Sequence, residues 1–283
     1  MRTPPNLKLA AIILTGLAGS VFAAEPALIF RAGDEVIADF HIADLQEVPG
    51  HGDFRLYDAM HDKRKHFAGV PLLALLKRAY GEILFDNEWS SIAFVAEDGY
   101  EAVAAFSTLI QQGAILVFED LDTAGWETIS GKGVDPGPYY LVWMNPQQLP
   151  KNGYPWPWQI KSISLLDFES TYPEIVPLGA ARNSTVDRGY RLFRSRCMSC
   201  HSMNKQGGNI GPDLKAPRNI SDYRSESYLK EFIRSSMSFG YSKMPQFADL
   251  SDSDLDDLVH YLQFMSSEDG NQGSSSLPGH DRP

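Results

Sequence analysis

The motif Cys-Met-Ser-Cys-His at positions 197–201 limits what this chain can fold into and bind more than any other feature. It holds the only two cysteines among the 283 residues. Cys-x-x-Cys followed directly by histidine is the attachment pattern of c-type haem. Two intervening residues let one helical turn present both thiols to the vinyl groups of a porphyrin, with the next imidazole facing the iron. The motif predicts covalent haem c on Cys197 and Cys200, with His201 as an iron ligand.

Three other uses of the cysteine pair compete with this interpretation. A disulfide between Cys197 and Cys200 would close a very short loop and would constrain the unfolded chain little. A thioredoxin-like redox pair requires a βαβ context, whereas the flanking residues look helical and then glycine-rich. Structural zinc takes four side-chain ligands, and after His201 neither cysteine nor histidine recurs until His260.

Residues 1–23 have the pattern of a signal peptide. Arg2 and Lys8 flank its start, residues 9–18 are apolar, and Val21-Phe22-Ala23 supplies a small-x-small cleavage site. The alternative is an uncleaved anchor, but the apolar run is shorter than the roughly 20 residues that a membrane span needs. We expect export to the periplasm and cleavage after about Ala23, which agrees with haem attachment outside the cytoplasm.

Charge and length limit the possible functions. With 36 acidic and 25 basic side chains, the net charge of −11 excludes a nucleic-acid binder. The length allows two modest domains with separate cores.

The region 24–170 is expected to form a small mixed α+β domain. Pro71 and the leucines that follow it predict a helix to Tyr80, and Asp98-Gly99 is a hairpin turn signal. Short runs rich in β-branched and aromatic residues predict strands at residues 27–30, 35–40, 54–57, 91–96, 101–106, 114–118 and 139–143.

No catalytic residues are predicted in this domain. Its histidines are scattered and are more typical of surface or hydrogen-bonded structural side chains than of a metal site: His41, His51, His61 and His66. The basic run Lys63-Arg64-Lys65 is interpreted as a solvated loop.

Four stretches of this region resemble the molybdopterin-binding domain of the sulfite-oxidase type, over roughly residues 27–168. They are Gly69-Val-Pro-Leu-Leu-Ala-Leu-Leu76, Phe94-Val-Ala-Glu-Asp-Gly-Tyr100, residues 114–119 and Trp158-Gln-Ile-Lys-Ser-Ile-Ser164. The resemblance implies a mixed α/β fold built around strands. That family ligates molybdenum through a cysteine thiolate, which this region lacks, so we expect a scaffold without molybdenum, kept for docking or folding.

Residues 171–183, rich in proline and small residues, are expected to link this domain to a second one at 184–265. Ser184 caps a helix whose apolar face runs into Cys197, and Gly189 would let another helix cross closely. Gly207-Gly208 and Gly211-Pro212 predict a loop without regular structure, in which the Pro212 carbonyl accepts the His201 ring N–H. A last helix follows Ser251, and the Gly/Ser-rich tail 266–283 is predicted to be disordered.

The sixth iron ligand is predicted to be Met244. Methionine offers a soft thioether, and Pro245 directly after it holds the chain in a non-helical course. Met237, seven residues earlier, is the rival candidate.

Taken together, Gly189-Tyr-Arg-Leu-Phe193, residues 197–201, Gly211-Pro-Asp-Leu214, Met244-Pro245 and the last helix resemble a class I cytochrome c over residues 184–265. The resemblance implies an all-α domain with a single low-spin haem, ligated axially by His201 and Met244. The predicted fold class is therefore an N-terminal mixed α+β domain followed by an all-α cytochrome c domain.

The main functional hypothesis is an exported monohaem cytochrome. It would carry single electrons from a dehydrogenase to an oxidase or another cytochrome, without catalysis of its own, because both axial positions are filled by protein. Four arginines near the motif could steer an acidic partner or form a solvated helix face: Arg188, Arg191, Arg194 and Arg196. The alternatives are the haem-containing part of a molybdopterin-type oxidoreductase, or a subunit whose first domain docks onto a dehydrogenase.

Overall fold

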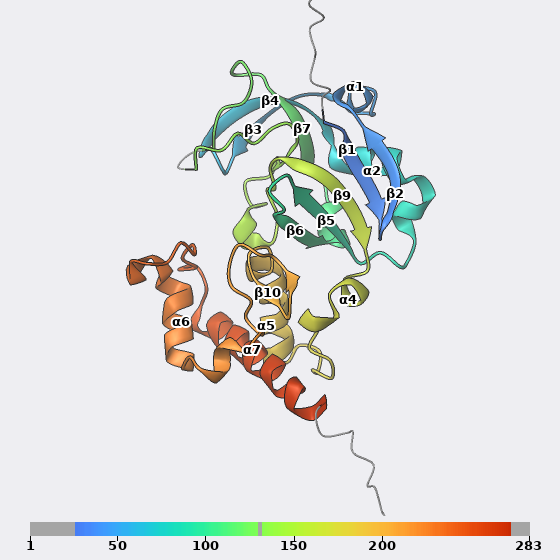
Figure 1. The fold of residues 1–283 in the computed structure, drawn as a ribbon. Coiled ribbons are helices and arrows are strands. Elements are labelled where there is room, and N and C mark those ends of the chain that lie inside the picture. Colours follow the sequence, from blue (N-terminus) through green and yellow to red (C-terminus); the bar gives the residue numbers. More distant parts are fainter. Residues whose placement is uncertain (1–25, 130–131, 273–283) are drawn as a thin grey trace, which may run out of the picture.

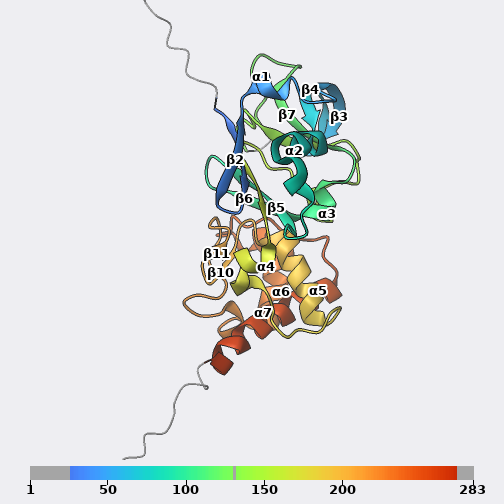
Figure 2. The ribbon, with the colours of Figure 1, turned by 90° about the vertical axis from the view of Figure 1, so that its right-hand side faces the viewer.

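The structure is a computed structural model that describes residues 26–129 and 132–272. Two sheets with their helices form the upper part of Figure 1, and helices α5, α6 and α7 gather in the lower part. The view turned by 90° in Figure 2 shows the same division. The predicted signal peptide lies outside the described residues.

One sheet has five strands in the order β2-β1-β9-β5-β6. Strands β1 and β9 are parallel, and the other neighbouring pairs are antiparallel. The turn at Asp98-Gly99 joins β5 to β6, as the sequence predicted. The strands are β1 Leu28–Ala32, β2 Glu35–Phe40, β9 Ile160–Leu166, β5 Ser91–Ala96 and β6 Glu101–Ala105.

The other sheet is antiparallel, with four strands in the order β3-β4-β7-β8. Its strands are β3 Gly52–Asp58, β4 Lys63–Pro71, β7 Ala114–Asp120 and β8 Tyr140–Trp143. All the predicted strands are present in the two sheets, with ends shifted by a few residues. Strands β4 and β9 were not predicted.

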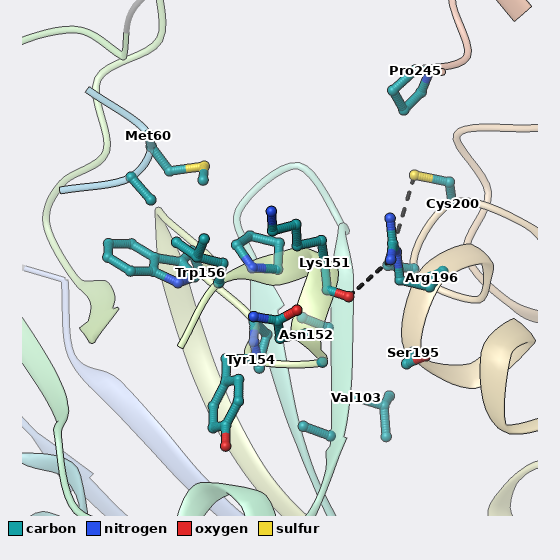
Figure 3. Close-up of a pocket in the computed structure, with 18 of the residues that line it drawn as sticks. Met60, Val103, Lys151, Asn152, Tyr154, Trp156, Ser195, Arg196, Cys200 and Pro245 are labelled. Carbon is teal, nitrogen blue, oxygen red and sulfur yellow. Dashed lines mark hydrogen bonds between the residues drawn. The ribbon is translucent and has the colours of Figure 1, made fainter. Parts of the chain in front are cut away.

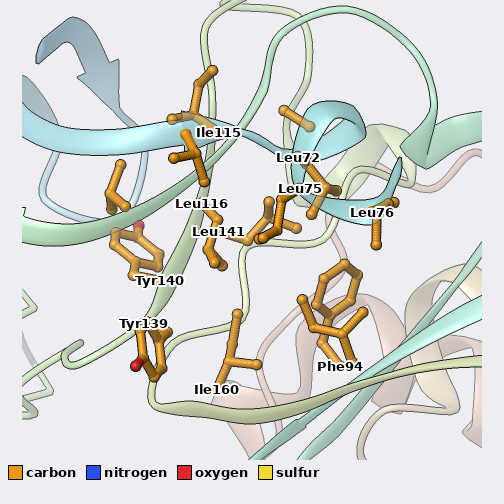
Figure 4. Packing of buried hydrophobic residues seen from close by; sticks show 14 of the residues in the cluster. Leu72, Leu75, Leu76, Phe94, Ile115, Leu116, Tyr139, Tyr140, Leu141 and Ile160 are labelled. Atoms are coloured by element: carbon orange, nitrogen blue, oxygen red, sulfur yellow. The ribbon is translucent and has the colours of Figure 1, made fainter. Parts of the chain in front are cut away.

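Helix α2 (Leu72–Tyr80) anchors the core of this region, and Pro71 precedes it as predicted. Its side chains Leu72, Leu75 and Leu76 are fully buried and face strand residues such as Leu116 in Figure 4. The Tyr80 hydroxyl donates to the carbonyl of Ile163 on β9, at 2.7 Å. Shorter helices are α1 Ile42–Leu45 and α3 Phe106–Leu109, with 3₁₀ turns at Gly81–Phe85 and Pro150–Asn152.

The interpretation of Lys63-Arg64-Lys65 as a solvated loop was wrong, because these residues begin strand β4. Lys65 is only 2% exposed, and its Nζ lies 2.6 Å from Asp120 Oδ2 and 2.9 Å from Glu127 Oε2. Lys63 Nζ contacts the other oxygen of Glu127 at 2.5 Å. A buried ammonium needs such charged partners, and here they come from a distant part of the sequence.

Glu127 gives the N-terminal region a testable acid dependence. Hydrogen bonds from Lys63 and Lys65 lower the pKa of Glu127 from 4.5 to about 2. The pKa is lower in the folded state, so the stabilisation is present above pH 4.5 and is lost as the pH falls towards 2. Urea unfolding followed by tryptophan fluorescence at several pH values should therefore show a shallower acid-induced loss of stability in Glu127→Gln than in wild type. The exposed Glu88→Gln is the control, and identical pH profiles for both variants would contradict this account.

The C-terminal region contains helices α5 Thr185–Leu192, α6 Glu226–Ser235 and α7 Asp252–Gln272, with further turns of 3₁₀ helix at Ile220–Asp222 and Ser236–Phe239. Ser184 caps α5 by accepting the Asp187 N–H, as predicted. Helix α7 continues past Ser266, where the tail was expected to begin, and residues 273–283 lie outside the described part. In the described ranges, no helix is long and apolar enough to cross a membrane.

The prediction that this region is all-α was wrong. Strands β10 (Ser202–Met203) and β11 (Gln206–Gly207) form an antiparallel hairpin in the predicted irregular loop. Asn204 and Lys205 at its turn have φ of 46° and 71°, as a tight hairpin turn requires. The Asp213 carboxylate accepts both of their backbone N–H groups, at 3.1 and 2.6 Å, so a side chain nine residues away stabilises the turn.

Helices α5 and α7 cross at Gly189, as its position in the sequence indicated. A Cβ atom built on Gly189 would lie 2.0 Å from the Asp257 carbonyl oxygen and 2.8 Å from Tyr261 Cβ. Beside this contact, Arg188 binds both carboxylate oxygens of Asp257, at 2.6 and 2.7 Å.

The stretch between the two regions is packed rather than extended. Helix α4 (Phe168–Thr171) and the 3₁₀ turn Pro173–Ile175 lie there, and the side chain of Ile175 is fully buried. The Tyr261 hydroxyl on α7 donates to the Ile175 carbonyl at 2.7 Å. The chain leading into α5 is therefore fastened to the C-terminal core.

Candidate haem site

The two cysteines and His201 lie on one tight turn at the end of a continuous helix. Helix α5 passes into a π-helical turn, Phe193–Cys197, and the Cys197 carbonyl then accepts the N–H groups of Cys200 (3.0 Å) and His201 (2.9 Å). π-helical turns of this kind occur often at functional sites. Because the backbone closes on itself here, both thiols and the imidazole project from the same turn.

The imidazole of His201 is held by the predicted partner. Its Nδ1 lies 2.8 Å from the Pro212 carbonyl, which can only accept a hydrogen bond, so Nδ1 carries the proton. A Cβ on Gly211 would lie 2.5 Å from His201 Cε1, so only glycine leaves room for the ring in this position. Nε2 has no hydrogen bond to any of the described residues and is the nitrogen suited to bind a metal.

These groups line one cavity of about 500 Å³ together with Met244. Its walls are mainly apolar, which suits a porphyrin, and are formed by Phe193, Leu214, Ile220, Leu229, Ile233, Leu258 and Leu262. A mainly apolar cavity with two thiols, one imidazole and one thioether has the donor set that haem c requires. The residues that line this cavity therefore fit haem c.

The structure distinguishes the two candidate methionines. Met244 is half-buried and lines the cavity, whereas Met237 is 65% exposed and does not. The Ser236 hydroxyl donates to the Met244 carbonyl at 2.8 Å, and the Met244 N–H donates to the Ser242 hydroxyl at 3.1 Å. The backbone at Met244 is therefore fixed on both sides.

The competing uses of the cysteine pair find less support. Cys197 and Cys200 are not joined to each other. Burial raises the pKa of the Cys197 thiol to about 12, opposite to the lowered pKa of reactive redox thiols.

Aromatic residues at the cavity were not singled out from the sequence. Tyr228 and Tyr241 line it, their hydroxyls lie 3.0 Å apart, and the Arg224 guanidinium carbon lies 4.8 Å from the centre of the Tyr228 ring. Arg224 precedes α6, Tyr228 lies in it and Tyr241 follows it, and the three show no regular spacing. Only the fold reveals that they are neighbours.

The arginines near the motif are engaged within the molecule. Arg191 pairs with Asp187 at 2.6 Å, and Arg196 pairs with Asp249 at 3.0 Å. The Arg194 guanidinium carbon lies 3.5 Å from the centre of the Phe168 ring, and Arg194 Nη2 donates to the Ser91 hydroxyl on β5, at 3.1 Å. Arg188 pairs with Asp257, so all four have internal roles besides any effect on a partner.

The C-terminal region is similar to known c-type cytochromes. Residues 184–262 match the family described as cytochrome c oxidase, cbb3-type, subunit III. A Corynebacterium diphtheriae protein named cytochrome bc1 complex cytochrome c subunit is 32% identical over 96 residues, which are 33% of this chain and 32% of that protein. A Synechocystis protein named cytochrome c-553-like is 29% identical over 106 residues, which are 38% of this chain and 92% of that protein.

The fold, the site and these matches define the class of the C-terminal region. It is a cytochrome c-type domain, similar to the cbb3-type family that matches residues 184–262, and this class implies haem c and electron transfer. The resemblance of the N-terminal region to a molybdopterin-binding domain is not confirmed by these matches and stays a prediction.

Proposed function

We propose that this chain is an exported monohaem c-type cytochrome that carries single electrons from a periplasmic dehydrogenase to an oxidase or another cytochrome. Cys197 and Cys200 would hold the haem, and His201 and Met244 would be its axial ligands. The haem would supply a one-electron Fe(III)/Fe(II) couple. The protein supplies the ligands, the mainly apolar cavity and the hydrogen-bonded turn that would keep the couple in place.

One observation carries this proposal: residues from two distant segments converge on a single cavity. Met244 comes 43 residues after His201 (244 − 201), yet both line the same apolar space as the two thiols. The decisive measurement is the visible spectrum of purified protein, oxidised and reduced, with iron content and intact mass. One covalent haem per chain with a low-spin spectrum would support the proposal, and a colourless preparation from cells that mature c-type cytochromes would overturn it.

Met244→Ala tests the sixth ligand. Removing the thioether should open one axial position, shift the ferric spectrum towards high spin and lower the reduction potential by roughly 0.1 V or more, since methionine ligation favours Fe(II). Spectra and a redox titration measure both effects. Met237→Ala, at an exposed position seven residues away, is the matched control and should behave as wild type. If Met237→Ala shows these changes and Met244→Ala does not, Met237 is the sixth ligand.

The second candidate is the haem-containing part of a molybdopterin-type oxidoreductase. The close packing of the sheet-rich region against the haem attachment turn favours it, because Arg194 on that turn donates to Ser91 of β5. Both cysteines of the chain lie in the haem motif, so no cysteine of the sheet-rich region can ligate molybdenum. Molybdenum near one equivalent in purified holoprotein would nevertheless establish this second function.

A further inference from the structure

A larger cavity lies between the two regions of the molecule. Its volume is about 930 Å³, and Figure 3 shows Trp156 and Met60 on one side of it with Arg196 and Cys200 on the other. Buried Ala102, Ala104 and Trp156 contribute to its walls, while Lys151, Asn152 and Gln246 are exposed at its surface. The space is thus a site with a buried part and access from solvent.

This cavity adjoins the candidate haem site. Cys200 and Pro245 line both cavities. The Arg196 guanidinium fixes the boundary between the two regions, because it donates to the Lys151 carbonyl at 2.8 Å and to Asp249 at 3.0 Å. A molecule bound in the larger cavity would therefore lie beside one of the two haem-binding thiols.

The charges on its lining favour an anion. Among the described lining residues, Asp62 is the one carboxylate, and it already accepts the Tyr57 hydroxyl. Five lining residues are basic: Lys132, Lys151, Arg191, Arg194 and Arg196. Arg191 and Arg196 are paired with carboxylates, whereas no ion pair joins Lys132 or Lys151 to a carboxylate in the described part of the chain. With five basic residues against one carboxylate, this lining is locally positive on a protein of net charge −11.

Aromatic rings provide the apolar part of the lining. Tyr100, Tyr154, Trp156 and Trp158 contribute to it, all from the sheet-rich region. Lys132 Nζ lies 4.5 Å from the centre of the Trp158 ring, so a cation and an aromatic surface are presented together. Flat apolar ligands pack well on such rings, and a few charged groups then orient them.

We propose that the cavity between the two regions binds a small organic anion with a flat, unsaturated body. Its carboxylate or comparable acidic group would lie towards Lys132 and Lys151, and its ring would pack among Trp156, Trp158 and Tyr154. The location beside the haem rests on the proposed function, whereas the binding itself does not.

Isothermal titration calorimetry of the holoprotein with 2-naphthoate tests the site, with the uncharged 2-naphthalenemethanol as the comparison probe. Naphthoate should bind about tenfold more tightly than the alcohol, equivalent to about 1.4 kcal/mol, because its carboxylate is attracted to the two lysines. Lys132→Gln combined with Lys151→Gln should remove this preference. Lys77→Gln combined with Lys205→Gln makes the same charge change outside the cavity and should leave it intact.

A second variant locates the binding. Ala105, exposed at the end of β6, lines the cavity, and Ala105→Trp should weaken both probes at least about tenfold by occupying the space. Equal affinity of the two probes for wild type, no binding of naphthoate, or full binding by Ala105→Trp would each overturn the proposal. The haem spectrum of the same samples reports separately on the proposed function, so the failure of one inference is not mistaken for failure of the other.

Discussion

Gly189→Ala is expected to destabilise the cytochrome c-type domain by about 3 kcal/mol, a large part of the 5–15 kcal/mol that a domain usually has. The added methyl would lie 2.0 Å from the Asp257 carbonyl oxygen, a contact that only movement of the α7 backbone can relieve. Alanine is favoured over glycine inside a helix by about 1 kcal/mol, so the expected destabilisation is what remains after this gain. A net loss would therefore show how strongly the crossing of α5 and α7 depends on close approach. Moving α7 would also disturb the Arg188–Asp257 ion pair beside the crossing and the hydrogen bond from Tyr261 to the Ile175 carbonyl.

Guanidinium unfolding of the holoprotein, followed through the haem absorbance, measures this loss. Gly52→Ala is the control because a Cβ there meets nothing within 4 Å and the residue is not in the left-handed region. It should change the free energy of unfolding by less than about 0.5 kcal/mol. If both variants unfold at the same denaturant concentration as wild type, α5 and α7 do not cross as closely as described.

Local sequence patterns predicted much of the site because its key groups are close in sequence. Cys197, Cys200 and His201 share one turn, and the Pro212 carbonyl that accepts the His201 ring N–H lies in the loop that was expected to provide it. Gly189 was informative because only one residue type permits such close helix packing. The helix cap at Ser184 could be predicted for the same reason, because it involves only neighbouring residues.

What the sequence did not reveal depends on contacts between distant segments. Lys65 looks like part of a solvated basic run until Asp120 and Glu127 are seen beside it. The β10–β11 hairpin depends on Asp213, whose carboxylate offers acceptors that no spacing rule anticipates. The cavity between the two regions combines residues from Tyr57 to Phe247, so only the folded chain shows it.

The second large effect is expected from replacing both thiols. In Cys197→Ser combined with Cys200→Ser, the covalently held haem should fall from about one equivalent to none, because a serine hydroxyl does not form the thioether. Haem staining of denatured protein and intact mass measure this directly. The proposed axial ligands His201 and Met244 remain, so a weakly bound haem that is lost on denaturation is compatible with this expectation.

The single variants and a neighbouring position separate attachment from folding. Cys200→Ser should retain haem through Cys197 alone at reduced yield, because the turn that presents both thiols is made by backbone hydrogen bonds to the Cys197 carbonyl. Ser199→Ala, in the same turn but without a thiol, should carry haem as wild type does. Haem that survives denaturation in the double variant would show that other residues form the attachment and would overturn the assignment of these two cysteines. Loss of haem in Ser199→Ala as well would mean that the turn itself, rather than its thiols, limits haem attachment.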